Sequence, residues 1–180
     1  MNRPSALMVE TDPQKAKQNK GTDSKEPIEQ AKQKLYDIEG VLYQPDTHIR
    51  GCLVEAGKEF SVKGKGKSTY SKIIGYSVEI NPMEIQHKKT KWEVYSVLAV
   101  NPNTRGRSIV HRPMFREWEL DFNITFDPSR IPEGVLREIL ETAGQIVGIG
   151  DWRPAKKGRF GKFEVTKWEP AKEVKAKARK

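Results

Sequence analysis

The sequence predicts an α+β protein in which two helices cover one face of an antiparallel sheet. Two observations lead to this class. Short apolar runs, alternating with polar residues, end at Asn-Pro or Asp-Pro pairs, which is typical of strands followed by turns. Two longer segments carry apolar residues at helical spacing. The expected order along the chain is strand, helix, three strands, helix, strand.

Five segments have the composition of strands. The first follows Tyr36 and ends at Gln44-Pro45, and two later ones end at Asn81-Pro82 and Asn101-Pro102. The fourth alternates apolar and polar residues until Asp127-Pro128. The expected strands are residues 38–43, 73–80, 92–100, 118–126 and 162–168.

Two segments have the spacing of amphipathic helices. The first follows Asp46 or Thr47, either of which is a suitable N-cap. The second starts at Pro132, which suits a first helical turn, and runs to Val147. Apolar residues recur three and four positions apart in both helices, at Ile49, Cys52, Leu53, Ala56 and Phe60 and at Val135, Leu136, Ile139, Leu140, Ala143, Ile146 and Val147.

One folded domain is expected between two polar ends. Residues 1–34 are rich in Lys, Gln, Asp and Glu and predict a disordered N-terminal extension, with a short nascent helix at residues 27–34. Residues 35–169 form the single α+β domain, and residues 170–180 form a basic disordered tail. The net charge of +9 favours polyanionic partners, because lysines and arginines that neutralise phosphates release condensed counterions.

Several classes of function lack the residues that they need. The single cysteine, Cys52, excludes an internal disulfide and a cysteine-based zinc site. The three histidines and the acidic residues show no metal-ligand spacing, so neither a metal nor another cofactor is expected. No run is apolar enough for a signal peptide or a membrane span, which predicts a cytoplasmic protein with no membrane partner. The glycine signatures at Gly64 and Gly148 lack the spacing and the preceding strand of nucleotide-binding loops.

The glycine-rich segment 148–161 is the first candidate binding site. Its glycines let the backbone approach a ligand closely. Trp152 and Phe160 offer flat rings on which bases stack. The candidate phosphate contacts are Arg153, Lys156, Lys157, Arg159 and, just beyond the segment, Lys162. The alternative is a helix cap followed by turns, with the aromatic rings, Trp152 first, in the core.

The segment 105–116 is the second candidate site. Four arginines stand here among turn residues, and each is a candidate phosphate contact: Arg105, Arg107, Arg112 and Arg116. The length and turn content of the segment predict a mobile hairpin that orders on binding. The alternative is a solvated loop without a ligand.

The chain resembles two kinds of protein. The order of elements, the glycines Gly148, Gly150, Gly158 and Gly161, and the helix entry at residues 48–51 resemble the RAMP superfamily of CRISPR effector proteins. This resemblance implies an RRM-like, ferredoxin-like fold that binds RNA through its sheet and through a glycine-rich loop before the last β-strand. It also implies homo-oligomers that assemble along the bound nucleic-acid strand. The amino-acid sequence of residues 148–165 also resembles small uncharacterised proteins of bacteriophages and prophages, which implies a phage origin and a bacterial host.

Three functions remain open from the sequence. The first is a non-enzymatic protein that binds single-stranded RNA or DNA through its basic, aromatic-bearing loops. The second is a viral interaction protein that targets or imitates a host CRISPR or other defence complex. The third is a metal-independent endoribonuclease, for which His48, at the start of the first helix, is the candidate general base.

Overall fold

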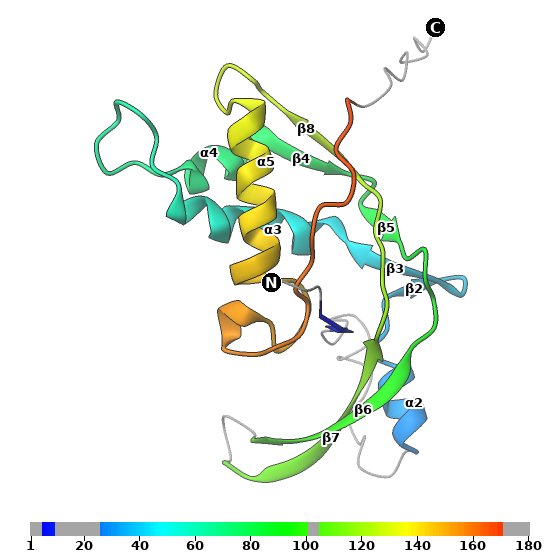
Figure 1. Ribbon diagram of the computed structural model, residues 1–180. Helices are drawn as coiled ribbons and strands as arrows, with labels where there is room; N and C mark the ends of the chain where they lie inside the picture. The colour runs from blue at the N-terminus through cyan, green and yellow to red at the C-terminus, as the bar shows by residue number, and fades with distance from the viewer. Residues whose placement is uncertain (1–4, 10–25, 101–104, 171–180) are drawn as a thin grey trace, which may run out of the picture.

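Short antiparallel sheets and helices make up the protein (Figure 1). The computed structural model describes residues 5–9, 26–100 and 105–170. In these ranges the helices are α2 (Pro27–Lys32), α3 (Asp46–Ala56), α4 (Tyr70–Ser77) and α5 (Glu133–Thr142). The strands are β1 (Leu7–Met8), β2 (Asp37–Ile38), β3 (Val41–Pro45), β4 (Val78–Asn81), β5 (Glu84–Gln86), β6 (Glu93–Val100), β7 (Arg107–Phe115) and β8 (Asn123–Phe126). The predicted α+β class is confirmed.

The described strands pair into three small antiparallel sheets, whereas the sequence predicts one sheet. Strand β7 lies between β1 and β6, β3 lies between β2 and β5, and β4 pairs with β8. The longest pairing joins β6 and β7 in a regular hairpin. This hairpin curves away from α3, α4 and α5 at the lower edge of the molecule in Figure 1.

The two helices with the clearest periodicity form the centre of the core. Helix α3 buries four of its predicted apolar residues, and α5 buries three: Ile49, Cys52, Leu53 and Ala56, and Leu136, Ile139 and Leu140. Full burial of a leucine or isoleucine contributes about 1.5–3 kcal/mol to the free energy of folding. After α5 the chain continues as a π-helical turn, η3 (Ala143–Val147), which packs against α3.

The predicted strand at residues 73–80 is wrong in its first half. Residues 70–77 form α4, and only Val78–Asn81 form a strand. Tyr70, Ile73 and Ile74 are all buried, on one helical face. Two adjacent isoleucines can share a core-facing side only on a helix, because side chains alternate across a strand.

The predicted strand at residues 118–126 is shorter than expected. Only its last four residues form β8, which pairs with β4. In the first part, Leu120 makes an isolated bridge with His87, and Trp118 packs edge-on against Phe163. Before Asn123 the segment therefore has one isolated bridge and aromatic packing but no continuous ladder.

The predicted closing strand at residues 162–168 is an extended segment outside the three sheets. It runs along α5 as a strap (residues 162–168). The Phe163 amide donates to Gly144 O at 3.1 Å, and Trp168 Nε1 donates to Glu133 Oε1 at 2.8 Å. Its alternating pattern reflects partial burial against the helix, because Phe163, Val165 and Trp168 pack on the core.

Part of the predicted N-terminal extension is ordered and buried. Leu7 and Met8 form β1, opposite Phe115 and Met114 of β7, and are almost fully buried. Helix α2 lies within the segment expected to be a nascent helix. The remainder of the extension, residues 1–4 and 10–25, and tail residues 171–180 lie outside the described residues.

Gly134, in the first turn of α5, and Gly144, in the turn η3 that follows α5, give a matched test of this packing. A Cβ at Gly144 would overlap the Phe163 carbonyl of the strap, whereas a Cβ at Gly134 meets no atom within 4 Å. We expect Gly144→Ala to lower the free energy of unfolding by about 2 kcal/mol or more, because backbone must move. Gly134→Ala should leave it equal or raise it by up to about 1 kcal/mol. Urea denaturation measures both, and equal stabilities would contradict the position of the strap.

Candidate nucleic-acid interface

The glycine loop (residues 148–161) is held to the N-terminal strand by its backbone. The Asp151 amide donates to Met8 O at 2.7 Å, and the Gly161 amide donates to Ala6 O at 2.8 Å. Gly150 has a φ of +76°, and a Cβ on it would overlap Met8 O. Glycine is required at this point because the loop backbone lies directly against the strand.

The middle of the glycine loop is closed on itself and presents cations to solvent. It contains a short 3-10 turn, η4 (Pro154–Lys156), and the Phe160 amide donates to Trp152 O at 3.1 Å. Gly158 lies so close to the Trp152 carbonyl that a Cβ would overlap it. The exposed charged side chains of this closed turn are Lys156, Lys157 and Arg159.

The β6–β7 hairpin contacts the glycine loop, so the two segments singled out in the sequence meet. An Arg112 Nη1 atom lies 2.5 Å from Asp151 Oδ2 in an ion pair whose side chains are largely buried. Tyr95, directly opposite Arg112 in the ladder, packs edge-on against Phe160 with ring centroids 5.3 Å apart. One face of the hairpin therefore forms a single surface with the glycine loop.

The two aromatic rings of the loop take different positions. Phe160 is buried with Met8 and Met114, and Arg159 lies over its ring, 5.4 Å from the centroid. Its ring is therefore core, and the prediction that it stacks on bases is corrected. Trp152 stays 39% exposed and leans on Phe160 at a centroid distance of 5.8 Å. The sequence suggested Trp152 as the first of the two to be buried, and the reverse holds.

Most of the hairpin arginines lie apart from the glycine loop. Arg107 is on the opposite face of β7 from Arg112, because the two are five positions apart on a strand. Arg105 is exposed beyond the end of β7, and Arg116 pairs with Glu93 at 2.7 Å beyond its other end. The sequence predicts a mobile hairpin within this segment, whereas residues 107–114 form one strand of the regular ladder with β6.

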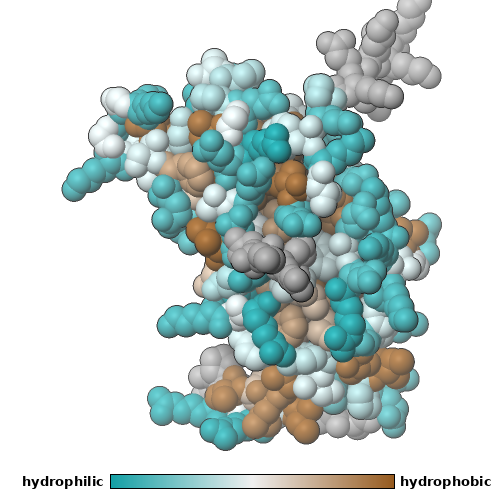
Figure 2. Space-filling view, in the orientation of Figure 1, coloured by the Kyte–Doolittle hydropathy of each residue, from teal (hydrophilic) through white to brown (hydrophobic). Residues whose placement is uncertain are grey.

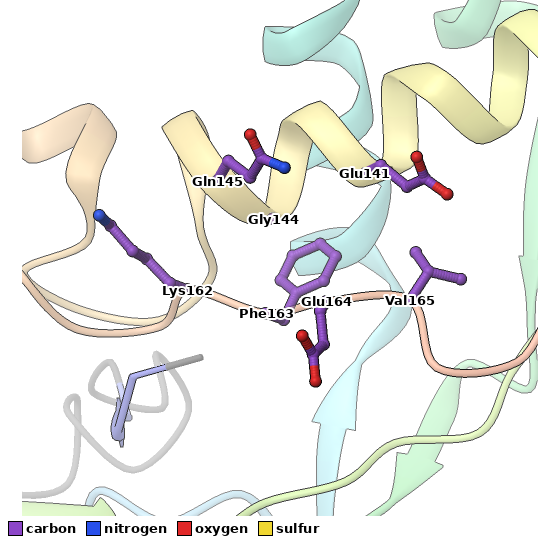
Figure 3. Close-up of a pocket in the computed structure, with 7 residues that line it drawn as sticks. All are labelled: Glu141, Gly144, Gln145, Lys162, Phe163, Glu164 and Val165. Carbon is purple, nitrogen blue, oxygen red and sulfur yellow. The ribbon is translucent and has the colours of Figure 1, made fainter. Parts of the chain in front are cut away.

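Two further predicted phosphate contacts, Arg153 and Lys162, are only partly exposed. Arg153 is half-buried, and its Nη1 donates to Gly150 O at 2.9 Å. Lys162 begins the strap and lines a hollow of about 180 Å³ between the strap and the end of α5. Figure 3 shows Lys162 at one end of this hollow and Glu141 near the other. The exposed cationic surface of the loop thus rests on Lys156, Lys157 and Arg159.

Lys34 is part of this site and was missed in the sequence. Its Nζ donates to His111 O on β7 at 2.6 Å. The pKa of Lys34 is lowered to about 8, first by burial and then by the charge of Arg112, while the charge of Asp151 opposes the shift. No sequence signal could have marked it, because it follows a run of lysines and glutamines in the polar N-terminal segment.

A second hollow, of about 270 Å³, lies between α3 and the glycine loop. It is lined by His48, Cys52 and Glu55 from the helix and by Arg153 and Lys156 from the loop. His48 Nδ1 is hydrogen-bonded to Gln44 Nε2, and its ring meets the edge of Tyr36. Burial raises the pKa of the Cys52 thiol to about 12, so the thiol is protonated and a poor nucleophile at neutral pH.

The other two histidines stand elsewhere. His87 is buried, stacked flat on Phe115 at 4.6 Å, and burial lowers its pKa to about 4, so the ring is neutral at neutral pH. His111 Nδ1 lies 2.8 Å from Ser96 Oγ across the β6–β7 ladder. The described residues contain no group of three or more His, Cys, Asp or Glu placed to hold a metal ion. None of the helices in the described ranges has the length and apolar character needed to span a bilayer.

Comparison with protein families, with curated proteins and with solved structures finds no match for this chain. Function is therefore inferred from the geometry of the site.

The titration of Lys34 tests the electrostatics of the site directly. In an NMR titration, we expect the Lys34 side-chain signal to report a pKa near 8, against about 10.4 for a free lysine. Arg112→Gln should raise this pKa because a repelling charge is removed, and Asp151→Asn should lower it because an attracting charge is removed. An unshifted Lys34, or shifts of the opposite sign in the two variants, would contradict the geometry.

Proposed function

We propose that this protein binds single-stranded nucleic acid, RNA or DNA, through the glycine loop and the hairpin face that contacts it, without catalysing a reaction. The observation that carries this proposal is one exposed aromatic ring among exposed cations of the glycine loop: Trp152 with Lys156, Lys157 and Arg159. Lysines and arginines bind phosphates, and an exposed indole stacks on a base.

The fixed backbone of the loop supports binding. The loop is held at Met8 and Ala6 and closed by the bond between Phe160 and Trp152, so few backbone torsions need ordering when a ligand binds. A preordered loop loses less conformational entropy on association than a mobile one. The net charge of +9 adds a long-range attraction to a polyanion.

The exposed indole favours an unpaired strand over a duplex. Bases in a duplex are stacked on one another and present only their edges, whereas bases of a single strand can stack on a protein ring. Trp152, on the outside of a small loop, can offer such a contact to one base.

The proposal is tested with labelled single strands by fluorescence anisotropy. When Lys156, Lys157 and Arg159 are replaced together by Gln, the plot of the logarithm of the association constant against the logarithm of the salt concentration should become less steep. The magnitude of its negative slope should fall by about 2, at roughly 0.7 per lost phosphate contact. Trp152→Ala should weaken binding by about 1–3 kcal/mol with the slope unchanged.

The chain offers a matched control for the charge change. Lys63, Lys65 and Lys67 are exposed in the loop that precedes α4, and replacing them by Gln removes the same charge from another surface. This control should affect binding far less than the glycine-loop variant. Absence of binding at low salt, or equal losses in the two triple variants, would sink the proposal.

A metal-independent ribonuclease is the second candidate function, and the hollow beside α3 favours it. His48 shares this hollow with Lys156 and Arg153. A histidine can take the proton of an RNA 2′-hydroxyl as it attacks the adjacent phosphate, while cations stabilise the charge of the transition state. The test is incubation of labelled RNA with chelator present. Cleavage that is lost in His48→Ala, and absent with DNA of the same sequence, would establish this function, whereas intact RNA would remove it.

The finer identity stays a prediction from the sequence. We propose on resemblance alone that the protein is of phage origin and related to the RAMP superfamily, with its ferredoxin-like fold and oligomeric assembly. The other alternative, a viral interaction protein that targets or imitates a host CRISPR or other defence complex, has the same basis. The structure supports the proposed ferredoxin-like fold only in its α+β class.

A further inference from the structure

The β6–β7 hairpin carries a second face that is open and apolar. Leu98 and Val100 on β6 are each 58% exposed, and Ile109 on β7 is 63% exposed. In the ladder, Leu98 stands opposite Ile109 and Val100 opposite Arg107. These four residues therefore form one patch, the open face, on the side of the hairpin away from Tyr95 and Arg112.

The apolar side chains of the open face are contiguous rather than scattered. Three aliphatic residues are adjacent on two strands and more than half exposed, with an arginine beside them. In Figure 2, hydrophobic side chains gather at the lower edge of the molecule, where the hairpin lies. Contiguous exposed apolar patches on a small protein mark sites of association.

A complementary patch lies at the turn between β2 and β3. Ile38 and Val41 face each other in this ladder and are 50% and 47% exposed. The turn residues Glu39 and Gly40 both have positive φ, 51° and 83°. Ile38, Glu39 and Val41, the acidic turn, thus combine an aliphatic pair with an exposed carboxylate.

The conformation of Glu39 is unusual for its residue type. The left-handed region costs a residue with a Cβ about 1 kcal/mol, and Asn, Asp or Gly fit such a turn better. Glu39 is exposed in this turn, so a cation of another molecule can approach its carboxylate.

We propose that the open face of one copy of this protein docks on the acidic turn of a second copy. The aliphatic residues of the two patches meet, and Arg107 pairs with Glu39. A contact between two open faces is less favourable, because the open face has no carboxylate to pair with Arg107. Aliphatic residues also give bases no ring to stack on, so nucleic acid is a poorer occupant of this face.

The positions of the two patches determine the kind of assembly. The acidic turn and the free end of the hairpin project from opposite sides of the molecule in Figure 1. One copy therefore cannot satisfy both patches by itself, and the contact between copies is head-to-tail. Such contacts form rings or open chains, depending on the rotation between copies. The small number of aliphatic residues indicates weak, concentration-dependent association.

Charge exchange tests this pairing without any nucleic acid. Nuclease-treated protein is followed by sedimentation velocity over a concentration series, and the wild-type sedimentation coefficient should rise with concentration. Arg107→Glu and Glu39→Arg should each weaken association about tenfold or more, because like charges then face each other. The double variant, and an equimolar mixture of the two single variants, should associate again.

Folding and charge controls complete the test. All exchanged side chains are exposed, and circular dichroism checks that the variants stay folded. Lys63→Glu, in the loop before α4, reverses one exposed charge elsewhere and should associate as the wild type does. Leu98→Ser with Ile109→Ser should lose association through the apolar part of the contact.

Four outcomes would overturn the proposal. The first is a wild-type protein that stays monomeric at every concentration. Association that disappears on nuclease treatment would identify nucleic acid as the bridge. Unchanged association in both single variants would identify another surface, and a double variant without restored association would refute the pairing of Arg107 with Glu39. Apart from the nuclease outcome, these results do not depend on the nucleic-acid interface, which is tested separately.

Discussion

The position of the N-terminal strand is the constraint on which the rest of the site depends. Residues 5–9 pair with β7 on one edge, where the Val9 amide donates to Pro113 O at 3.1 Å, and with the glycine loop on the other, through Met8 O and Ala6 O. Both flanking segments thereby share one strand. Because Leu7 and Met8 are almost fully buried, this strand is also part of the core. Its backbone bonds place the hairpin and the glycine loop side by side.

Side-chain charges act within this backbone frame. The pair between Arg112 and Asp151 lies partly out of water, and Lys34 is close enough for both charges to affect its pKa. A partly desolvated pair gains Coulomb energy but loses hydration, so its net stabilisation is small. The ion pair instead orients the glycine loop relative to β7. Lys156, Lys157 and Arg159 are therefore exposed to solvent on a loop whose backbone is held in place.

The hairpin has two faces with different surroundings. Tyr95 and Arg112 face the glycine loop, whereas Leu98 and Ile109 stand on the other side of the same ladder. Alternation along a strand separates these two surfaces by a single residue step. The same physics explains why a list of four arginines in one segment could not be read as one site. Arg107 and Arg112 are near in sequence and belong to opposite faces.

The sequence by itself determined the helices α3 and α5, the α+β class and the location of the charged segments. These features depend on local periodicity and on turn residues, which act over a few positions. Tertiary structure decided what depends on distant contacts. Residues 162–168 have the alternation of a strand but pack along α5, and Leu7 and Met8 lie between β7 and the glycine loop, to which their backbone is hydrogen-bonded. Phe160 and Trp152 differ in burial because β1 and β6 cover only one of them. These contacts join residues 19 and 35 positions apart for the strap and more than a hundred positions apart for β1, and local spacing carries no record of them.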